Sequence, residues 1–200
     1  MLEYVASNGQ QCIDTLYCPN PNTEFDLHIS LYKRIGDSFD SGATAVFGVS
    51  EGDYAFTFNH GSGGGDIFYF WSDKTYDSGG AIYTIYGVKA MLDKVPRVSY
   101  KLYQETYYMA YVGDYEVKIA KNTHTYTNSA FLLGRRKNGI LDNPYKIYQT
   151  RIYGLKIYES GVLVRNYIPA QKDGVCGLYE EMNGTWHPSF TGVDLLPPTE

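Results

Sequence analysis

Apolar side chains alternate with single, mostly polar ones in short stretches along this sequence, and this alternation constrains the fold more than any other feature. The clearest stretch has an apolar residue at every second position: Phe25, Leu27, Ile29 and Leu31. A period of two is typical of a β-strand with one buried face. The same pattern, or a short apolar run between turn residues, predicts further strands over 43–49, 54–58, 67–71, 81–88 and 97–103.

The stretch 107–120 has the pattern of a β-hairpin. Tyr107, Met109 and Tyr111 are expected to share one face, and alternation resumes after Gly113-Asp114. A glycine in the first position of a two-residue loop suits a type II′ turn, whose twist matches that of the flanking strands.

A second hairpin is predicted over 151–168, with its turn at Glu159-Ser160-Gly161. In its first strand Tyr153, Leu155 and Ile157 are expected to share one face. Many short strands, close turn signals and the near absence of helical patterns predict an all-β chain that forms a two-sheet antiparallel β-sandwich or a barrel.

The length of 200 residues fits one domain, which can bury enough surface to fold without a metal or a disulfide. We expect a single domain over residues 1–195. The last residues, 196–200, include two prolines and are predicted to be a terminal tail or linker.

The net charge of −5 argues against a partner such as nucleic acid or an anionic membrane, because phosphate binding requires clustered Lys and Arg. The one basic cluster, Arg135-Arg136-Lys137, precedes Asn138-Gly139 and is predicted to be a solvated turn. No apolar stretch reaches the length of a transmembrane helix, and the first residues lack the pattern of a signal peptide.

Two segments resemble a known family. Residues 2–15 read LEYVASNGQQCIDT, similar to the LEYIxSxGxQYIDT opening of LamG-like, concanavalin A-like jelly-roll domains. The closing segment reads RIYGLKIY at 151–158, GVLVRNYIPA at 161–170 and GVCGLYE at 174–180, followed by Gly184 and Trp186. The family has tyrosine where this chain has Cys12, and aspartate where it has Glu180.

The resemblance implies a concanavalin A-like jelly roll of the kind found in bacteriophage tail and fibre proteins and in proteins of gut Firmicutes. It implies a location in a virion or on a bacterial cell surface. It implies no activity, because this fold serves lectins, glycosidases and structural modules alike. Within the motifs, Tyr4, Cys12 and Ile13 are expected to face the core, Gly177 to permit close backbone packing, and Leu178 and Tyr179 to return to the core.

Catalytic motifs are absent from the sequence, so no enzyme is predicted. There is no E-x-D-x-x-E strand of the kind that concanavalin A-like glycosidases share, and Glu180 and Glu181 are adjacent, so on a strand they would point to opposite faces. No two histidines have metal-ligand spacing, and Ser62 does not lie in a nucleophile elbow. No cofactor and no metal are predicted.

Three cysteines, an odd number, indicate free thiols, although a Cys12–Cys18 bridge stays open as an alternative.

Aromatic residues mark two candidate ligand surfaces, because their flat rings can stack on sugar rings. The first surface, our predicted ligand-binding site, adds an acidic acceptor for sugar hydroxyls and consists of Tyr69, Trp71, Asp73, Tyr76, Tyr83 and Tyr86. The second consists of Tyr100, Tyr103, Tyr107, Tyr108 and Tyr111. The competing interpretation is core packing, which takes one face of each strand and so about half of these side chains.

Three functions compete at this level. The first is a non-enzymatic recognition module that binds glycans of a bacterial envelope. The second is a structural module whose partner is another virion protein, and it predicts a homo-oligomer. The third, an enzyme acting on polysaccharide, requires a pair of carboxylates in a groove and ranks last.

Overall fold

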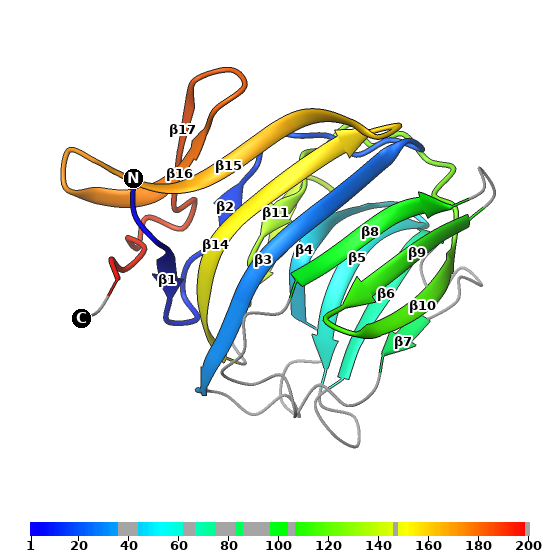
Figure 1. Cartoon of the computed structure of the whole chain (residues 1–200), viewed down its shortest axis with the longest axis horizontal. Helices are drawn as coiled ribbons and strands as arrows, with labels where there is room; N and C mark the ends of the chain where they lie inside the picture. The colour runs from blue at the N-terminus through cyan, green and yellow to red at the C-terminus, as the bar shows by residue number, and fades with distance from the viewer. Residues whose placement is uncertain are drawn as a thin grey trace.

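The computed structural model describes residues 1–35, 44–61, 67–74, 83–85, 97–103, 107–145 and 148–198. These residues form strands and turns only, and the strands build two β-sheets (Figure 1). The prediction of an all-β, two-sheet protein is therefore confirmed. The described part of the chain holds no helix of the length and apolar character needed to cross a membrane.

Sheet A has nine strands, and all its pairs are antiparallel. Its order is β10-β9-β8-β3-β14-β15-β16-β17, with β1 as an additional partner of β14. The strands are β1 (Val5–Ser7), β3 (Thr23–Arg34), β8 (Arg97–Tyr103), β9 (Tyr107–Val112), β10 (Tyr115–Ala120), β14 (Tyr148–Glu159), β15 (Val162–Lys172), β16 (Val175–Glu180) and β17 (Thr185–Pro188).

Sheet B has eight strands in the order β13-β12-β4-β5-β6-β7, with β11 joining β4 to β2. It is mixed, because β12 runs parallel to β4. The strands are β2 (Ile13–Asp14), β4 (Thr44–Glu51), β5 (Tyr54–Gly61), β6 (Ile67–Lys74), β7 (Tyr83–Ile85), β11 (Phe131–Leu132), β12 (Gly134–Lys137) and β13 (Ile140–Pro144).

The predicted strands agree closely with the observed ones. The strand predicted over 97–103 is β8, and only the part of 81–88 that forms β7 lies within the described residues. Both hairpins form as predicted, β9–β10 and β14–β15. Gly113 has φ of 59°, whereas Asp114 has no positive φ, which matches the type II′ turn expected from the sequence.

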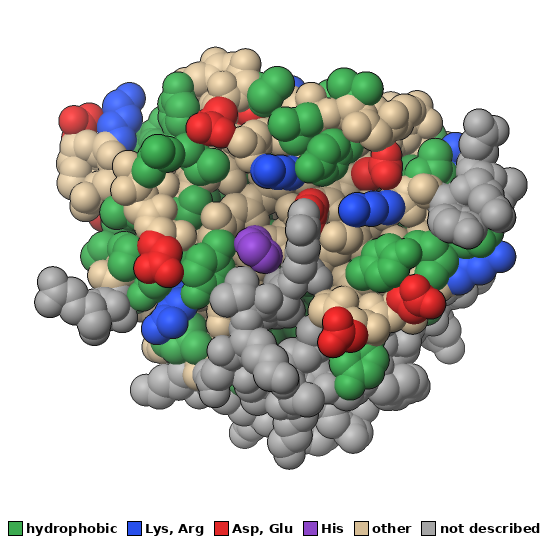
Figure 2. All heavy atoms as spheres, viewed as in Figure 1, with side chains coloured by type: hydrophobic (Ala, Val, Ile, Leu, Met, Phe, Trp, Pro, Cys, Tyr) green, Lys and Arg blue, Asp and Glu red, His purple; other side chains and the backbone are tan. Residues whose placement is uncertain are grey.

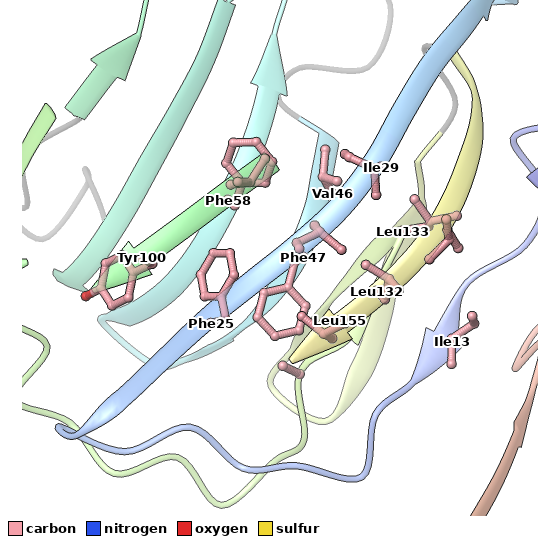
Figure 3. Close-up of a cluster of buried hydrophobic side chains, with 14 of the residues drawn as sticks. Ile13, Phe25, Ile29, Val46, Phe47, Phe58, Tyr100, Leu132, Leu133 and Leu155 are labelled. Carbon is pink, nitrogen blue, oxygen red and sulfur yellow. The ribbon is translucent and has the colours of Figure 1, made fainter. Parts of the chain in front are cut away.

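The hydrophobic core lies between the two sheets. Phe25 of β3 contacts Phe47 of β4 edge to face, with ring centres 5.0 Å apart, and stacks on Tyr100 of β8 at 5.6 Å. Figure 3 shows these side chains pointing into the space between the sheets, together with Phe58 and Leu155. Alternation along each strand of sheet A therefore sends one set of side chains into this core and the other set to the opposite face, which we call the outer face of sheet A.

The end of the described chain closes one side of the molecule. Ala6 exchanges two backbone hydrogen bonds with Leu196, each 2.8 Å, and Leu195 forms a bridge with Cys176. The segment predicted as a tail is thus paired with the fold at Leu196, and the end of the described chain lies on the same side of the molecule as the N-terminus (Figure 1). Strands β14, β15 and β16, this segment and β1 form a ring, because β1 pairs with β14 in turn.

The basic cluster is not the solvated turn that the sequence suggested. Arg135 and Arg136 lie in strand β12, are half-buried, and form ion pairs with Asp142 and Asp14 respectively. The turn consists of Asn138-Gly139 alone, which connects β12 to β13. Ion pairing explains how two arginines can lie in a largely covered strand.

In the two segments that resemble the family, most of the residues have the structural roles expected from the sequence. Tyr4, Cys12 and Ile13 are buried, and a Cβ on Gly177 would come within 2.7 Å of the Trp186 ring, so close packing requires glycine there. Tyr179 is the exception among the predicted core residues: it is 39% exposed, because it alternates with buried Leu178 on β16. All three cysteines are free.

Candidate functional site

A hollow of about 250 Å³ opens on the outer face of sheet A, where strand β14 changes partner. Residues 150–152 of β14 pair with β1, whereas residues 155–159 pair with β15. Beyond Tyr167, β15 pairs with β16 only. The two strands separate at this point, and the hollow fills the fork. It is lined by Asp26, His28, Tyr153, Gly154, Leu155, Lys156, Asn166, Tyr167 and Ile168.

A β-bulge at Tyr153 shapes the hollow. In β3, Ile29 pairs with Ile152 and His28 pairs with Gly154, so Tyr153 is an extra residue without a partner in the ladder. A bulge of this kind bends the strand and redirects its side chains. Gly154 has φ of 156°, and a Cβ there would lie 3.1 Å from the carbonyl oxygen of Tyr167. The fork therefore depends on glycine at this position.

The bulge corrects one prediction about the faces of β14. The sequence placed Tyr153 on the same face as Leu155 and Ile157. In the structure Ile152, Leu155 and Ile157 are buried in the core, whereas Tyr153 is half-buried and lines the hollow. The extra residue shifts the alternation by one position, which simple period-two counting does not include.

Three polar side chains meet in the hollow as direct register partners. Asp26 of β3 pairs with Lys156 of β14, which pairs with Asn166 of β15. The hydroxyl of Ser99 donates a hydrogen bond of 2.9 Å to the carboxylate of Asp26, a residue that is 8% exposed. Lys156 is exposed, so the hollow presents a fixed acceptor, a solvent-facing cation and an amide side by side.

Aromatic rings and one guanidinium flank these polar groups. The Tyr153 ring lies edge to face with His28, at 6.2 Å between centres, and contacts Tyr4 at 5.5 Å. Arg151 lies over the rings of Tyr4 and Tyr32, at 4.8 Å and 4.6 Å. Contacts of this kind restrict the rotation of the rings, so that the aromatic surface next to the hollow is preformed.

Two glutamates support Asn166 from behind. Glu180 is fully buried and accepts hydrogen bonds from the backbone N–H groups of Asn166, Met182 and Asn183, at 3.0, 2.9 and 3.0 Å. The Asn166 side-chain amide donates to the carboxylate of Glu181. Because its amide nitrogen is held in this way, the amide oxygen of Asn166 has a defined direction.

Two further carboxylates, the buried Glu24 and the half-buried Glu51, accept hydrogen bonds from the backbone. Glu24 accepts from the N–H groups of Leu102 and Gly161, at 3.1 and 2.7 Å. Burial alone would raise the pKa of Glu51, but hydrogen bonds donated by Thr127 and Asn128 outweigh burial and hold that pKa below its usual value. These carboxylates are occupied by structural contacts of the described chain.

The thiols are poor nucleophiles. Burial, with a smaller contribution from Asp14, raises the pKa of Cys12 to about 12. Burial also raises the pKa of Cys18 and of Cys176. A thiol with a raised pKa is almost entirely protonated near neutral pH, and the thiolate is the reactive form. Within the described residues, no three His, Cys, Asp or Glu side chains gather as metal ligands would.

The described residues of the predicted ligand-binding site lie on sheet B, away from the hollow. Trp71 is half-buried on β6, with the Arg135 guanidinium 5.9 Å from its ring centre. Asp73 has φ of 78° and accepts hydrogen bonds from the backbone and the hydroxyl of Thr123, so its carboxylate anchors a neighbouring loop. For Tyr69 and Tyr83 the structure describes only the backbone, in β6 and β7, and Tyr76 and Tyr86 lie outside the described residues.

The second aromatic group divides between core and surface. Tyr100 and Tyr108 stack on each other at 4.1 Å between ring centres and are buried. Tyr107 and Tyr111 are half-buried on the outer face of sheet A. The core interpretation is therefore right for two of these tyrosines.

Sequence reasoning missed the hollow itself. The alternation of Phe25, Leu27 and Ile29 leaves Asp26 and His28 on the opposite face of that strand, but nothing in it indicates a concave site. The spacing of Ile152, Leu155 and Ile157 around Gly154 was the available sign of a bulge, because a regular strand does not bury residues three apart. Asn166 could not be found, since its place depends on long-range pairing.

No family model, no curated protein and no solved structure matches this chain.

Proposed function

We propose that this chain is a non-enzymatic recognition module that binds carbohydrate in the hollow on the outer face of sheet A. One observation carries the proposal: the hollow combines an aromatic surface, Tyr153 beside His28, with the acceptor, cation and amide of Asp26, Lys156 and Asn166. A sugar ring has apolar C–H faces and a rim of hydroxyls. A concave site with apolar walls and a few placed polar groups matches both features.

The rigidity of the site supports the same proposal. Gly154 permits the close approach of β14 to β15 at the point where the two strands separate. Ser99 holds the Asp26 carboxylate, and Glu181 holds the Asn166 amide. Groups that are already oriented lose little entropy when a ligand binds. The occupied carboxylates and protonated thiols favour a binding role over a catalytic one.

The wider setting follows from the motifs in the sequence. We propose a concanavalin A-like jelly roll, in which the antiparallel sheet A and the mixed sheet B pack face to face as a sandwich. Support comes from the strand order of sheet A, in which β3 lies between β8 and β14. These neighbours are far apart in the sequence, so the chain crosses over between them. The resemblance to phage tail and Firmicutes proteins makes the envelope of bacteria the proposed source of the ligand and a virion or cell surface the proposed location.

A glycan array and a pull-down with bacterial cell-wall polysaccharide test the function. We expect Tyr153→Ala to weaken binding about tenfold, a loss of about 1.4 kcal/mol. Tyr115→Ala is the matched control, because Tyr115 is 44% exposed on β10 and lies outside the hollow; it should bind like the unmodified protein. A blank array together with a blank pull-down would contradict the proposal.

A second function has one observation in its favour. Tyr179 and Met182 are 39% and 55% exposed on the β16–β17 hairpin, which projects from the molecule (Figure 1). Exposed apolar side chains on a projecting element suit contact with another protein, such as a second virion subunit or a second copy of this chain. Light scattering that shows a strict monomer would remove the second copy as its partner.

A further inference from the structure

A row of register partners crosses the outer face of sheet A and ends in the hollow. Each residue of the row pairs directly with the next, on the strand order β10, β9, β8, β3, β14 and β15: Glu116, Tyr111, Ser99, Asp26, Lys156 and Asn166. At the spacing of about 4.8 Å between strands, the row is about 24 Å long. A surface of this length can contact several sugar rings of one chain.

The lysines of this face are available to a ligand, whereas two of its acids are engaged. Asp26 is held by Ser99, and Glu24 accepts two backbone N–H groups. Lys156 and Lys101 are exposed, and in the described part of the molecule their ammonium groups form no hydrogen bond or ion pair. Lysine and arginine side chains appear across this face, with aspartate and glutamate side chains among them (Figure 2).

The exposed charges of this face are mostly positive, because Lys101, Lys118 and Lys156 are exposed whereas Glu24 and Asp26 are buried. The Lys118 ammonium lies 3.7 Å from the Tyr107 ring centre on the same face, one row from Glu116. Glu116 is the one exposed acid of the row, at its far end. An anionic ligand would meet the exposed ammonium groups of Lys156 and Lys101, whereas Asp26 beside Lys156 is largely buried and the Glu181 carboxylate already accepts a hydrogen bond from Asn166.

We propose that the ligand is a linear acidic polysaccharide that lies across the strands of sheet A along this row. Its anionic groups, uronate carboxylates or phosphodiesters, pair with Lys156 and Lys101. Its sugar faces contact Tyr153 and Tyr111. This inference rests on the proposed carbohydrate function and adds the charge, the length and the direction of the ligand.

Calorimetric titration of the unmodified chain tests the charge and length of the ligand. The probes are oligogalacturonates from dimer to octamer, the same oligomers as neutral methyl esters, oligomeric glycerol phosphate, and a single-stranded oligonucleotide of equal charge. We expect an acidic hexamer to bind at least tenfold more tightly than its methyl ester and than the dimer. The glycerol phosphate arm shows whether carboxylate or phosphodiester is preferred.

Two variants test the site. Lys156→Gln should weaken binding of the acidic hexamer about tenfold, because an ion pair to the ligand is lost. Lys172→Gln removes the same charge from an exposed lysine at the far end of β15 and should change the affinity less than twofold. Equal losses in the two variants would overturn the proposed site, because they would indicate attraction by overall charge alone.

The remaining outcomes separate the two proposals. Methyl esters that bind as tightly as the acidic oligomers, or a dimer that binds as tightly as the hexamer, would overturn the inference and leave carbohydrate binding intact. An oligonucleotide that binds as tightly as the acidic hexamer would also overturn it. Failure of every saccharide, neutral and acidic, would overturn both proposals.

Discussion

Ala6 and Leu196 are paired through two backbone hydrogen bonds, although they lie at opposite ends of the described chain. The bonds place Leu195 beside Cys176 of β16, where its side chain is buried. This contact closes the ring of strands that includes β14 and β15, which separate at the hollow. The site therefore depends on chain segments far apart in sequence.

Closure of the ring predicts unequal effects of two neighbouring substitutions. Leu195→Ala removes a side chain that is 2% exposed and should lower the free energy of unfolding by about 2–4 kcal/mol. Leu196→Ala is the control, since its side chain is 39% exposed and its backbone bonds are kept; it should cost about 0.5 kcal/mol or less. Urea unfolding measures both. Equal costs would contradict the role of Leu195 in the closure.

Substitution of Gly154 should alter both stability and the hollow. Gly154→Ala forces a side chain into a φ of 156° and within 3.1 Å of the Tyr167 carbonyl oxygen, and we expect a loss of about 2–3 kcal/mol. Gly52→Ala is the control, because Gly52 also has a positive φ but no atom near its Cβ position. It should cost about 1 kcal/mol. Thermal unfolding that ranks the two equally would contradict the steric part of this account.

Removal of the hydroxyl group should have opposite effects on stability at two buried tyrosines, Tyr126 and Tyr167. Within the described structure the Tyr126 hydroxyl makes no hydrogen bond, whereas that of Tyr167 donates to the carbonyl oxygen of Thr15 at 2.7 Å. Tyr126→Phe should leave stability unchanged or raise it by up to about 1 kcal/mol. Tyr167→Phe should lower it by about 1 kcal/mol. Urea midpoints that fall equally in both variants would be inconsistent with these contacts.

Stability should fall in alkali. Burial raises the pKa of Cys12 from 9.0 to about 12, and burial also raises the pKa values of Tyr17, Tyr108, Tyr126 and Tyr167 above 10.0. In the unfolded chain these groups lose their protons first, so the unfolded state binds fewer protons as pH rises through 9 and 10. These groups therefore stabilise the folded state in full below pH 9, and this stabilisation is lost progressively as the pH rises above 9.

Urea midpoints measured from pH 7 to pH 11 check this prediction. The midpoint should be nearly level up to about pH 9 and then decline with increasing slope. Tyr126→Phe removes one of the groups and should reduce the slope above pH 10. A midpoint that stays constant to pH 11 would contradict the burial of these groups in a protonated form.

Local pattern was sufficient to predict most of the fold. The alternation of Phe25, Leu27 and Ile29 predicted β3, and Gly113 predicted the type of the turn between β9 and β10. Both features depend on neighbouring residues only. Ring closure at Ala6 and Leu196 could not be predicted, since it depends on pairing over nearly the whole chain. The ion pairs of Arg135 and Arg136 with Asp142 and Asp14 could not be predicted either, because they depend on which strands of sheet B become neighbours.

The candidate site was harder to predict than the fold. An aromatic-rich stretch drew attention to Trp71 and Asp73, yet Asp73 serves to anchor Thr123. The hollow is built from single residues on β3, β14 and β15, and one bulge residue, Tyr153, decides its shape. A bulge arises from competition between core packing and ladder pairing, which a pattern of alternating residues does not encode.

Amide chemical-shift mapping with a bound acidic oligosaccharide is the most direct test of carbohydrate binding in the hollow. We expect the largest shifts on His28, on residues 153–156 and on residues 166–168, with smaller shifts along the row toward Tyr111. Shifts that instead centre on Trp71 and Asp73 of β6, with the hollow unchanged, would contradict the account and favour the aromatic surface of sheet B.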